Sequence, residues 1–325
     1  SEEGALYRDL GLDLRWLDIT AQDKWIARFP ALKALIPYNN ESRRSLGYLM
    51  ALEEGAQIII SIDDDNFPID DYDFLSYHAV VGQTLDLLTV DTSDGLYNFC
   101  ERLTLEPARL CYPRGYPFFA RGRPQQQSRE MRRVRVGINA GLWLAEPDLD
   151  ATTWLNGPVT AVAGEVEPLA LGNVTWSPIN TQNTAVVRDL LPAYMCVPMG
   201  VPIGDLRLER YGDIWSGYFV RAVAKRLGYT VTSSGPLVEH RRNPHHYLKD
   251  LMHEFWGMIL LEDIYRLCRE TALTSHTARD CYLELAEAIH KMGRDRTDLP
   301  ASVPEYLSGL ARSMSVWIAT VRQLM

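Results

Sequence analysis

The sequence lacks any apolar run long enough to form a transmembrane helix, so no membrane span is expected within it. It also lacks an excess of basic residues, since 33 Lys and Arg stand against 42 Asp and Glu, a formal net charge of -9. That balance argues against a general nucleic-acid-binding protein. The negative net charge is still compatible with binding a phosphate-bearing small molecule, because a bound metal or a local arginine cluster makes the electrostatic potential positive at the site.

Cysteine is scarce, and the five cysteines show neither an even number nor a CxxC spacing. A disulfide framework and a zinc site are therefore not indicated, and reduced thiols in a cytoplasmic protein are the simplest interpretation. Internal repeats are absent as well. What remains is a chain of 325 residues, 46% hydrophobic and 23% charged, a composition typical of a globular enzyme with a sizeable core.

Two helix–strand units organise the chain. Residues 41–55 carry apolar side chains at helical spacing and end near a glycine, and the apolar run at 57–62 predicts a fully buried strand. The second unit is a helix over 213–229 with a glycine stop, followed by a strand over 230–240. A further short strand is predicted at 86–90. This alternation is typical of an α/β fold.

The middle of the chain and its C-terminal part differ in sequence pattern. Residues 91–185 are rich in Gly, Pro, Asn and aromatics and predict loops and strands, whereas the chain from 246 onward predicts helices. We therefore expect an α/β domain over 1–245 and a helical C-terminal lobe over 246–325. The apolar stripes of the lobe would serve as core or as the surface of a homo-oligomer.

Three adjacent aspartates, Asp63, Asp64 and Asp65, directly follow the strand at 57–62. Open α/β sheets bind ligands at the carboxyl ends of their strands. Carboxylate oxygens suit Mg²⁺ or Mn²⁺, and alternation along an extended chain puts Asp63 and Asp65 on one side. Taken alone, the three residues are explained equally well by a solvated acidic turn.

Two residues far downstream belong to the same hypothesis. Asp213 stands at a predicted helix start and His240 at a predicted strand end. Each has an ordinary explanation by itself: a helix-start acid is stabilised by the macrodipole, and a strand-end histidine is more often a surface or hydrogen-bonded residue than a ligand. Together with the aspartates they fit a nucleotide-sugar site, with Asp63, Asp65 and His240 as metal ligands and Asp213 as candidate base.

Several longer motifs occur in one order between about residue 15 and about residue 290: "RSLGYLMALEEGAQIIISIDDDNF", "PRGYPFFARG", "AGLWLAEPDLDA", "ERYGDIWSGYFVRAVAKRLGY" and "EHRRNP". They resemble the reversibly glycosylated polypeptide family, the plant UDP-arabinopyranose mutases and their bacterial relatives, and we expect a diverged bacterial member. The RGYPF and GLWL-x-x-PD-x-DA pieces are specific to that family, unlike three aspartates alone.

The resemblance implies a GT-A-like nucleotide-sugar-binding fold, with a mixed, mostly parallel sheet flanked by helices and a divalent metal. It places Asp63, Asp64 and Asp65 on the family's DDD, expected to bind Mn²⁺ or Mg²⁺ and the UDP diphosphate. Arg44 falls on an arginine suited to the diphosphate, because a guanidinium fork matches phosphate oxygens. Arg114 falls on the arginine that becomes reversibly glycosylated in the family.

The chain departs from the family pattern at identifiable positions. Gly212 stands where the family's YDD motif has its first acid, and Ala140 replaces a histidine that precedes GLWL. The family's first strand and nucleotide-binding turn, which would hold uracil, have no counterpart in the printed sequence. We expect that this strand belongs to a part of the protein that precedes Ser1.

The family resemblance implies a metal-dependent UDP-sugar mutase that interconverts pyranose and furanose forms. A GT-A glycosyltransferase that moves a sugar to a small-molecule or protein acceptor is the alternative, and the changes at Gly212 and Ala140 favour it. A non-catalytic, self-glycosylated partner protein is a second alternative, and a metal-dependent phosphohydrolase is a weaker third. The residues by themselves do not separate these possibilities.

Overall fold

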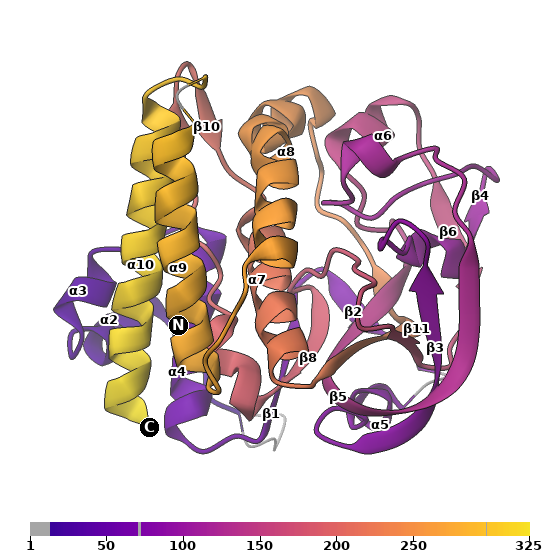
Figure 1. Cartoon of the computed structure of the whole chain (residues 1–325), viewed down its shortest axis with the longest axis horizontal. Coiled ribbons are helices and arrows are strands. Elements are labelled where there is room, and N and C mark those ends of the chain that lie inside the picture. The colour runs from indigo at the N-terminus through magenta and orange to yellow at the C-terminus, as the bar shows by residue number, and fades with distance from the viewer. Residues whose placement is uncertain (1–13, 71–72, 297) are drawn as a thin grey trace.

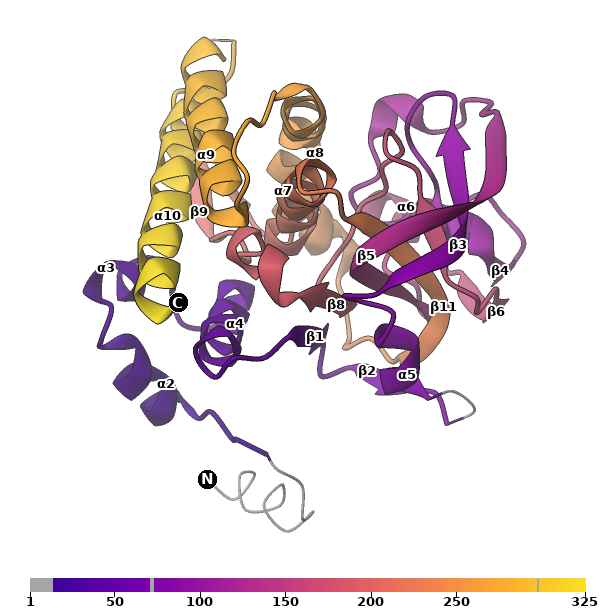
Figure 2. The same cartoon turned by 60° about the horizontal axis from the view of Figure 1, so that its bottom comes forward.

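The computed structural model describes residues 14–70, 73–296 and 298–325. They form a large mixed β-sheet flanked by helices, with a helical C-terminal region (Figure 1), an α/β architecture consistent with a GT-A-like fold. Turning the molecule shows the N-terminal helices beside the last two C-terminal helices, at the end of the molecule away from the long strands (Figure 2).

The main sheet follows the order β1 (Ile58–Ile62), β8 (Asn183–Val187), β5 (Gln127–Ala145), β3 (Thr84–Thr92), β7 (Leu169–Leu171), β11 (Thr230–His240) and β2 (Asn66–Pro68). Off this path lie β4 (Leu103–Glu106) and β6 (Thr160–Gly164), while β9 (Val201–Ile203) and β10 (Leu206–Leu208) form a separate hairpin. The strands predicted at 57–62, 86–90 and 230–240 are confirmed as β1, β3 and β11.

The α-helices are α2 (Ile19–Ile26), α3 (Pro30–Lys33), α4 (Arg44–Glu53), α5 (Phe74–His78), α6 (Ala151–Leu155), α7 (Gly212–Arg226), α8 (Tyr247–Glu270), α9 (Ala278–Asp295) and α10 (Ser302–Leu324). Short 3₁₀ turns are η1 (Glu41–Arg43), η2 (Phe99–Arg102), η3 (Phe118–Ala120) and η4 (Arg188–Ala193). The predicted helices over 41–55 and 213–229 are confirmed as α4 and α7, and the predicted C-terminal helices as α8, α9 and α10.

The strand directions correct one part of the sheet prediction. Among the described strands, β5–β11 and β3–β7 are parallel pairs, and the other ladders are antiparallel. A mixed sheet is confirmed, but a mostly parallel one is wrong. Parallel neighbours need a crossover of a dozen or more residues, usually through a helix. The short helices α5 and α6, of five residues each, do not provide such crossovers.

The strand β1 is less buried than its sequence predicts. Ile62 is 40% exposed, and the three preceding isoleucines are only partly buried. Within the described sheet, β1 is an edge strand that pairs with β8 alone, so one of its sides is uncovered. The prediction of a fully buried strand is therefore wrong, although its position ahead of the aspartates is confirmed.

The main hydrophobic core runs from the N-terminal helices through the sheet to α10, and a small second cluster contains Val81, Val136 and Ala185. Trp215 of α7 packs against Tyr306 of α10, with 6.1 Å between the ring centroids. A domain boundary near 245 and a homo-oligomer through the C-terminal helices both stay predictions. In the described ranges, no helix combines the length and apolarity needed to cross a bilayer. All five cysteines are free and buried.

The turn at Gly115 fixes a candidate residue against α7. Gly115 has a φ of 85°, and a Cβ built on it would lie 2.3 Å from Cγ2 of Ile214. The hydroxyl of Tyr218 donates to the Gly115 carbonyl at 2.8 Å. A residue without a Cβ is required here, because the backbone approaches α7 too closely for a side chain. Arg114 is consequently held beside the first turn of α7.

We predict that Gly115→Ala lowers the free energy of unfolding by about 2–4 kcal/mol, combining left-handed strain with overpacking against Ile214. The matched control is Gly122→Ala, whose φ is 68° but whose Cβ would meet nothing within 4 Å. It should lose only about 1 kcal/mol, from backbone strain alone. Urea denaturation of both variants measures the difference, and equal losses would contradict the steric account.

Candidate active site

A polar cavity of about 240 Å³ collects side chains from widely separated parts of the chain. The predicted site residues that line it are Arg44, Asp63, Asp65, Arg114, Asp213 and His240. Asp64 does not line this cavity. It borders a neighbouring cavity of about 710 Å³ between α4 and β1, as expected if alternate residues point to opposite sides.

Arg44 connects α4 to the carboxyl end of β1. Its Nη2 donates to Oδ1 of Asp63 at 2.6 Å, and its Nη1 donates to Ser61 Oγ and to the Thr181 carbonyl, each at 3.1 Å. Burial raises the pKa of Asp63 above its ordinary value, although Arg44 acts in the opposite direction. The first aspartate of the triplet is thus fixed by an arginine on the preceding helix.

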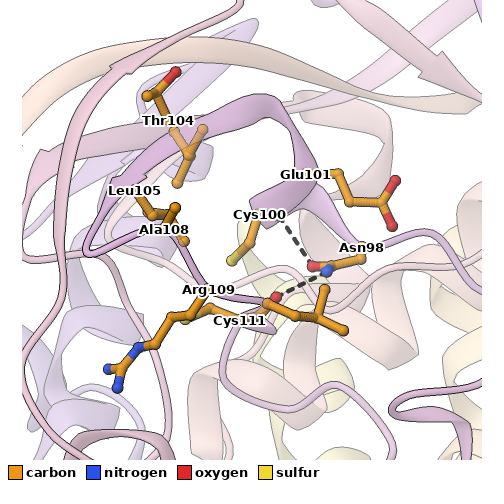
Figure 3. A pocket seen from close by; sticks show the side chains of 10 residues that line it. Asn98, Cys100, Glu101, Thr104, Leu105, Ala108, Arg109 and Cys111 are labelled. Atoms are coloured by element: carbon orange, nitrogen blue, oxygen red, sulfur yellow. Dashed lines mark hydrogen bonds between the residues drawn. The ribbon is translucent and has the colours of Figure 1, made fainter.

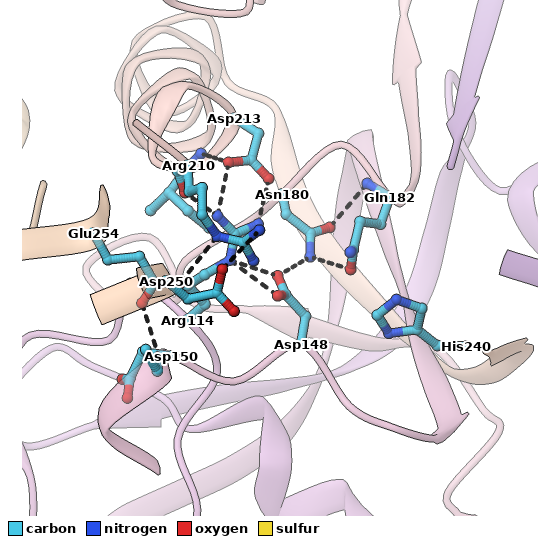
Figure 4. A network of polar contacts seen from close by, with 12 residues as sticks. Arg114, Asp148, Asp150, Asn180, Gln182, Arg210, Asp213, His240, Asp250 and Glu254 are labelled. Atoms are coloured by element: carbon cyan, nitrogen blue, oxygen red, sulfur yellow. Dashed lines mark hydrogen bonds and ion pairs between the residues drawn. The ribbon is translucent and has the colours of Figure 1, made fainter. Parts of the chain in front are cut away.

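Arg114 is the centre of the site and is only 6% exposed. Its Nε donates to Asp148 Oδ1 at 2.9 Å, and its Nη2 donates to Asp213 Oδ2 at 2.8 Å (Figure 4). Its Nη1 donates to Asp213 Oδ1 at 3.3 Å and to the Arg210 carbonyl. Burial acts to lower the pKa of the guanidinium, but Asp148 and Asp213 hold it well above its ordinary value.

Asp148 lines the cavity and pairs with Arg114, and the sequence did not single it out. Burial acts to raise the pKa of its carboxyl, but Arg114 and Asn180, whose Nδ2 donates to Oδ2 at 2.8 Å, hold it below the ordinary value. The backbone N–H of Arg114 also donates to the Asp148 carbonyl at 2.9 Å, which ties the two loops together. The signal was available, since Asp148 is the aspartate of "EPD" in the GLWL motif.

Two acids of α8, Asp250 and Glu254, pair with Arg210, which lines the cavity. Arg210 approaches Glu254 with 3.4 Å between Nε and Oε1, and Asp250 with 3.7 Å between Nη1 and Oδ1. Oε2 of Glu254 accepts the backbone N–H of Ala151 at 2.9 Å. Burial raises the pKa of Glu254 to about 7. Glu254 could not be singled out beforehand, because α8 has the sequence pattern of an ordinary structural helix.

His240 and Asp65 face each other across the cavity. The Nδ1 of His240 lies 2.6 Å from the Glu146 carbonyl, which can only accept, so Nδ1 carries the proton. The other ring nitrogen, Nε2, lies 3.4 Å from Oδ2 of Asp65. Within the described residues, no three His, Cys, Asp or Glu side chains gather at metal-binding spacing. The three-ligand set of Asp63, Asp65 and His240 stays a prediction.

Gly212, which stands where the family has an acid, is approached closely by the Glu41 carboxyl. The Gly212 N–H donates to Oε1 of Glu41 at 3.0 Å, and a Cβ at position 212 would lie 2.5 Å from that oxygen. The Glu41 carboxyl thus lies where a side chain at 212 would begin. Sequence reasoning noticed the missing acid at Gly212 and missed Glu41, which lines the cavity from η1.

Another cavity, of about 380 Å³, lies away from these residues and is lined by Cys100 and Cys111 (Figure 3). The amide of Asn98 donates to the Cys111 carbonyl at 2.8 Å and accepts the Cys100 N–H at 3.1 Å. Burial raises the pKa of both thiols, which makes them poor nucleophiles. None of the predicted site residues lines this cavity.

The sequence model of the family described as "Reversibly glycosylated polypeptide" matches residues 22–325. This chain belongs to the reversibly glycosylated polypeptide family. The resemblance predicted from the motifs is confirmed, and the match extends beyond residue 290 to the end of α10. The C-terminal helices are therefore part of what this family member shares with its relatives.

Curated relatives are similar to this family member over most of its length. UDP-arabinopyranose mutase 1 of Arabidopsis thaliana is 26% identical over 291 residues, covering 87% of this chain and 73% of the relative. UDP-arabinopyranose mutase 3 of the same plant is 27% identical over 299 residues, covering 89% and 74%. UDP-arabinopyranose mutase 1 of Oryza sativa subsp. japonica is 26% identical over 292 residues, covering 87% and 71%.

We predict that Arg114→Ala costs about 3–5 kcal/mol of unfolding free energy, because Asp148 and Asp213 are then buried without their cation. The matched control is Arg133→Ala, which breaks an exposed ion pair with Asp86 at 3.3 Å and should cost at most about 1 kcal/mol. Urea denaturation at neutral pH measures both losses.

The same pair of variants has an expected pH dependence. The pKa of Asp148 is lowered in the folded state, so its stabilisation is present above the ordinary aspartate pKa of about 4. It is lost as the pH falls through the lowered folded-state value. The stability gap between the native chain and Arg114→Ala should consequently narrow below about pH 4. A gap no larger than that of Arg133→Ala at neutral pH would contradict the central role of Arg114.

Proposed function

We propose that this protein is a UDP-sugar mutase that interconverts the pyranose and furanose forms of a UDP-linked sugar. The observation that carries the proposal is the convergence of the predicted residues on one polar cavity, next to a larger cavity suited to a nucleoside. Membership of the family and the relatives named UDP-arabinopyranose mutases support it.

The two cavities share Glu41, Arg44 and Asp63 along their common border. A guanidinium at that border is well placed for a diphosphate, because its planar fork matches pairs of phosphate oxygens. The larger cavity, lined by Tyr48 and Ile60 among others, would take the nucleoside. The smaller, charged cavity would take the sugar, which leaves its anomeric carbon near the border.

Asp65 and His240 fit a divalent cation. Oδ2 of Asp65 and Nε2 of His240 lie 3.4 Å apart, and the hydrogen bond to the Glu146 carbonyl orients the ring as metal-bound histidines are usually oriented. Mn²⁺ or Mg²⁺ bound there would neutralise negative charge on the diphosphate leaving group. Asp63, held by Arg44, is the third candidate ligand.

Arg114 and Asp213 contribute through the position of their charges beside the sugar cavity. Arg114 donates from all three of its nitrogens to protein acceptors, which supports an electrostatic role rather than attack on the sugar. Asp213 accepts from Arg114 with both oxygens and so helps to fix that cation beside the sugar cavity. The exchange of ring forms needs a proton acceptor and a proton donor, because one hydroxyl oxygen enters the ring while another leaves it.

Incubation with UDP-arabinopyranose and Mn²⁺, without any acceptor, tests the proposal. Chromatography should show UDP-arabinofuranose at equilibrium with the starting compound. No conversion until a second substrate is added would instead identify a glycosyltransferase. Label that stays on the protein with no released product would identify a self-glycosylated partner protein.

We predict that EDTA abolishes the interconversion and that Mn²⁺ restores it. Asp65→Asn and His240→Gln should each raise the Mn²⁺ concentration needed for half-maximal rate by at least about tenfold, because each removes a ligand or weakens one. Asp64→Asn is the matched control, since its side chain borders the other cavity and should leave the Mn²⁺ requirement unchanged. An identical Mn²⁺ dependence in all three variants would contradict the metal site.

A further inference from the structure

Glu41 stands at the border between the two cavities and lines both of them. It is the first residue of η1, whose preceding Asn40 caps the turn by accepting the Ser42 N–H at 3.0 Å. Asn40 also donates to the Met199 carbonyl at 3.2 Å, which fixes η1 against the loop before β9. The carboxyl of Glu41 is therefore held at the place where the diphosphate and sugar regions meet.

The position of this carboxyl depends on Gly212. The Gly212 N–H donates to Oε1 at 3.0 Å, and any Cβ at position 212 would lie 2.5 Å from the same oxygen. Among the described hydrogen bonds and ion pairs, Glu41 has no arginine or lysine partner. Three of the other carboxylates in the cavity differ, since Arg44 holds Asp63 and Arg114 holds Asp148 and Asp213. The fourth, Asp65, faces His240.

We propose that Glu41 is the catalytic residue that carries the proton during ring exchange, an inference that rests on the mutase function proposed above. Its location lets it reach the sugar, and it has no ion-pair partner to hold it in one protonation state. Burial and the nearby Asp213 raise the pKa of Glu41 to about 7, against the opposing effects of Arg114, Arg44 and the Gly212 N–H. A group with that value exchanges protons efficiently near neutral pH.

The proton balance of the reaction fits one carboxyl group. The bond from the anomeric carbon to the UDP oxygen breaks, and the electron pair stays on the diphosphate. A sugar hydroxyl then bonds to the anomeric carbon and gives its proton to the Glu41 carboxylate. The former ring oxygen takes that proton as its own bond to the anomeric carbon breaks, and the diphosphate oxygen bonds to this carbon again. No proton is gained or lost overall, and Glu41 ends as a carboxylate.

The other charged or titratable groups around Glu41 are either ion-paired with each other or have a pKa far above neutral. Asp213 on α7 and Arg114 are paired with each other, and Arg44 on α4 is paired with Asp63. Cys196 and Tyr306 also interact electrostatically with Glu41, and burial raises the pKa of each far above neutral. Near pH 7 the Cys196 thiol and the Tyr306 hydroxyl therefore stay protonated, so neither of them accepts the proton from the sugar.

The test compares Glu41→Gln with Glu254→Gln in the full chain, with UDP-arabinopyranose and Mn²⁺. Glutamine at 41 keeps an oxygen for the Gly212 N–H but cannot carry the proton, so kcat should fall by about 10²- to 10⁴-fold. UDP binding and the melting temperature should stay unchanged. In the native chain, kcat/KM should rise with pH through a midpoint near 7, and this limb should be absent from any residual activity of Glu41→Gln.

Glu254 is the matched control because burial raises its pKa to the same value of about 7, yet it does not line the cavity. Glu254→Gln should keep the pH limb. A Glu41→Gln enzyme with the native rate and limb overturns the role of Glu41 and leaves the mutase function intact. Parallel loss of UDP binding and thermal stability in Glu41→Gln identifies a purely structural residue and also overturns it. A native chain that converts no UDP-sugar overturns both proposals together.

Discussion

The buried guanidinium of Arg114 is the interaction on which the site depends. It lies between Asp148, from the loop after β5, and Asp213, from the first turn of α7. A buried carboxylate without a counterion is strongly unfavourable, so the two acids and the arginine require one another. The glycine that follows Arg114 allows this, because its backbone packs directly on Ile214. One ion-pair cluster thereby fixes the sheet, a loop and a helix in a single arrangement.

This cluster also determines which acidic groups near the cavity lack a cationic partner. Arg114 and Arg44 are already committed to Asp148, Asp213 and Asp63, so their positive charge is largely neutralised where Glu41 lies. Burial and the neighbouring Asp213 consequently raise the pKa of Glu41 more than the two arginines lower it, so that this pKa is near neutral. His240 is set apart in a different way, since the Glu146 carbonyl fixes its ring and leaves Nε2 directed at Asp65.

Local patterns predicted much of this arrangement. The helix–strand unit ahead of Asp63, the helix start at Asp213 and the strand end at His240 all follow from short-range periodicity, and the family motifs followed from their order. Glu41 and Glu254 could not be predicted this way, because their partners lie 171 and 103 residues away. The strand directions were also missed, because most neighbouring strands of the sheet lie far apart in the sequence, as β1 and β8 do. The edge position of β1 depends on pairing that no single segment specifies.

The central claim is that the converging residues bind a UDP-sugar, with the diphosphate at Arg44 and a cation between Asp65 and His240. A crystal structure of the chain soaked with UDP and Mn²⁺, recorded at the manganese absorption edge, tests it most directly. The account predicts one anomalous peak within bonding distance of Asp65 and His240, and phosphate density contacting Arg44. UDP bound elsewhere, or a manganese peak away from these two residues, would contradict it.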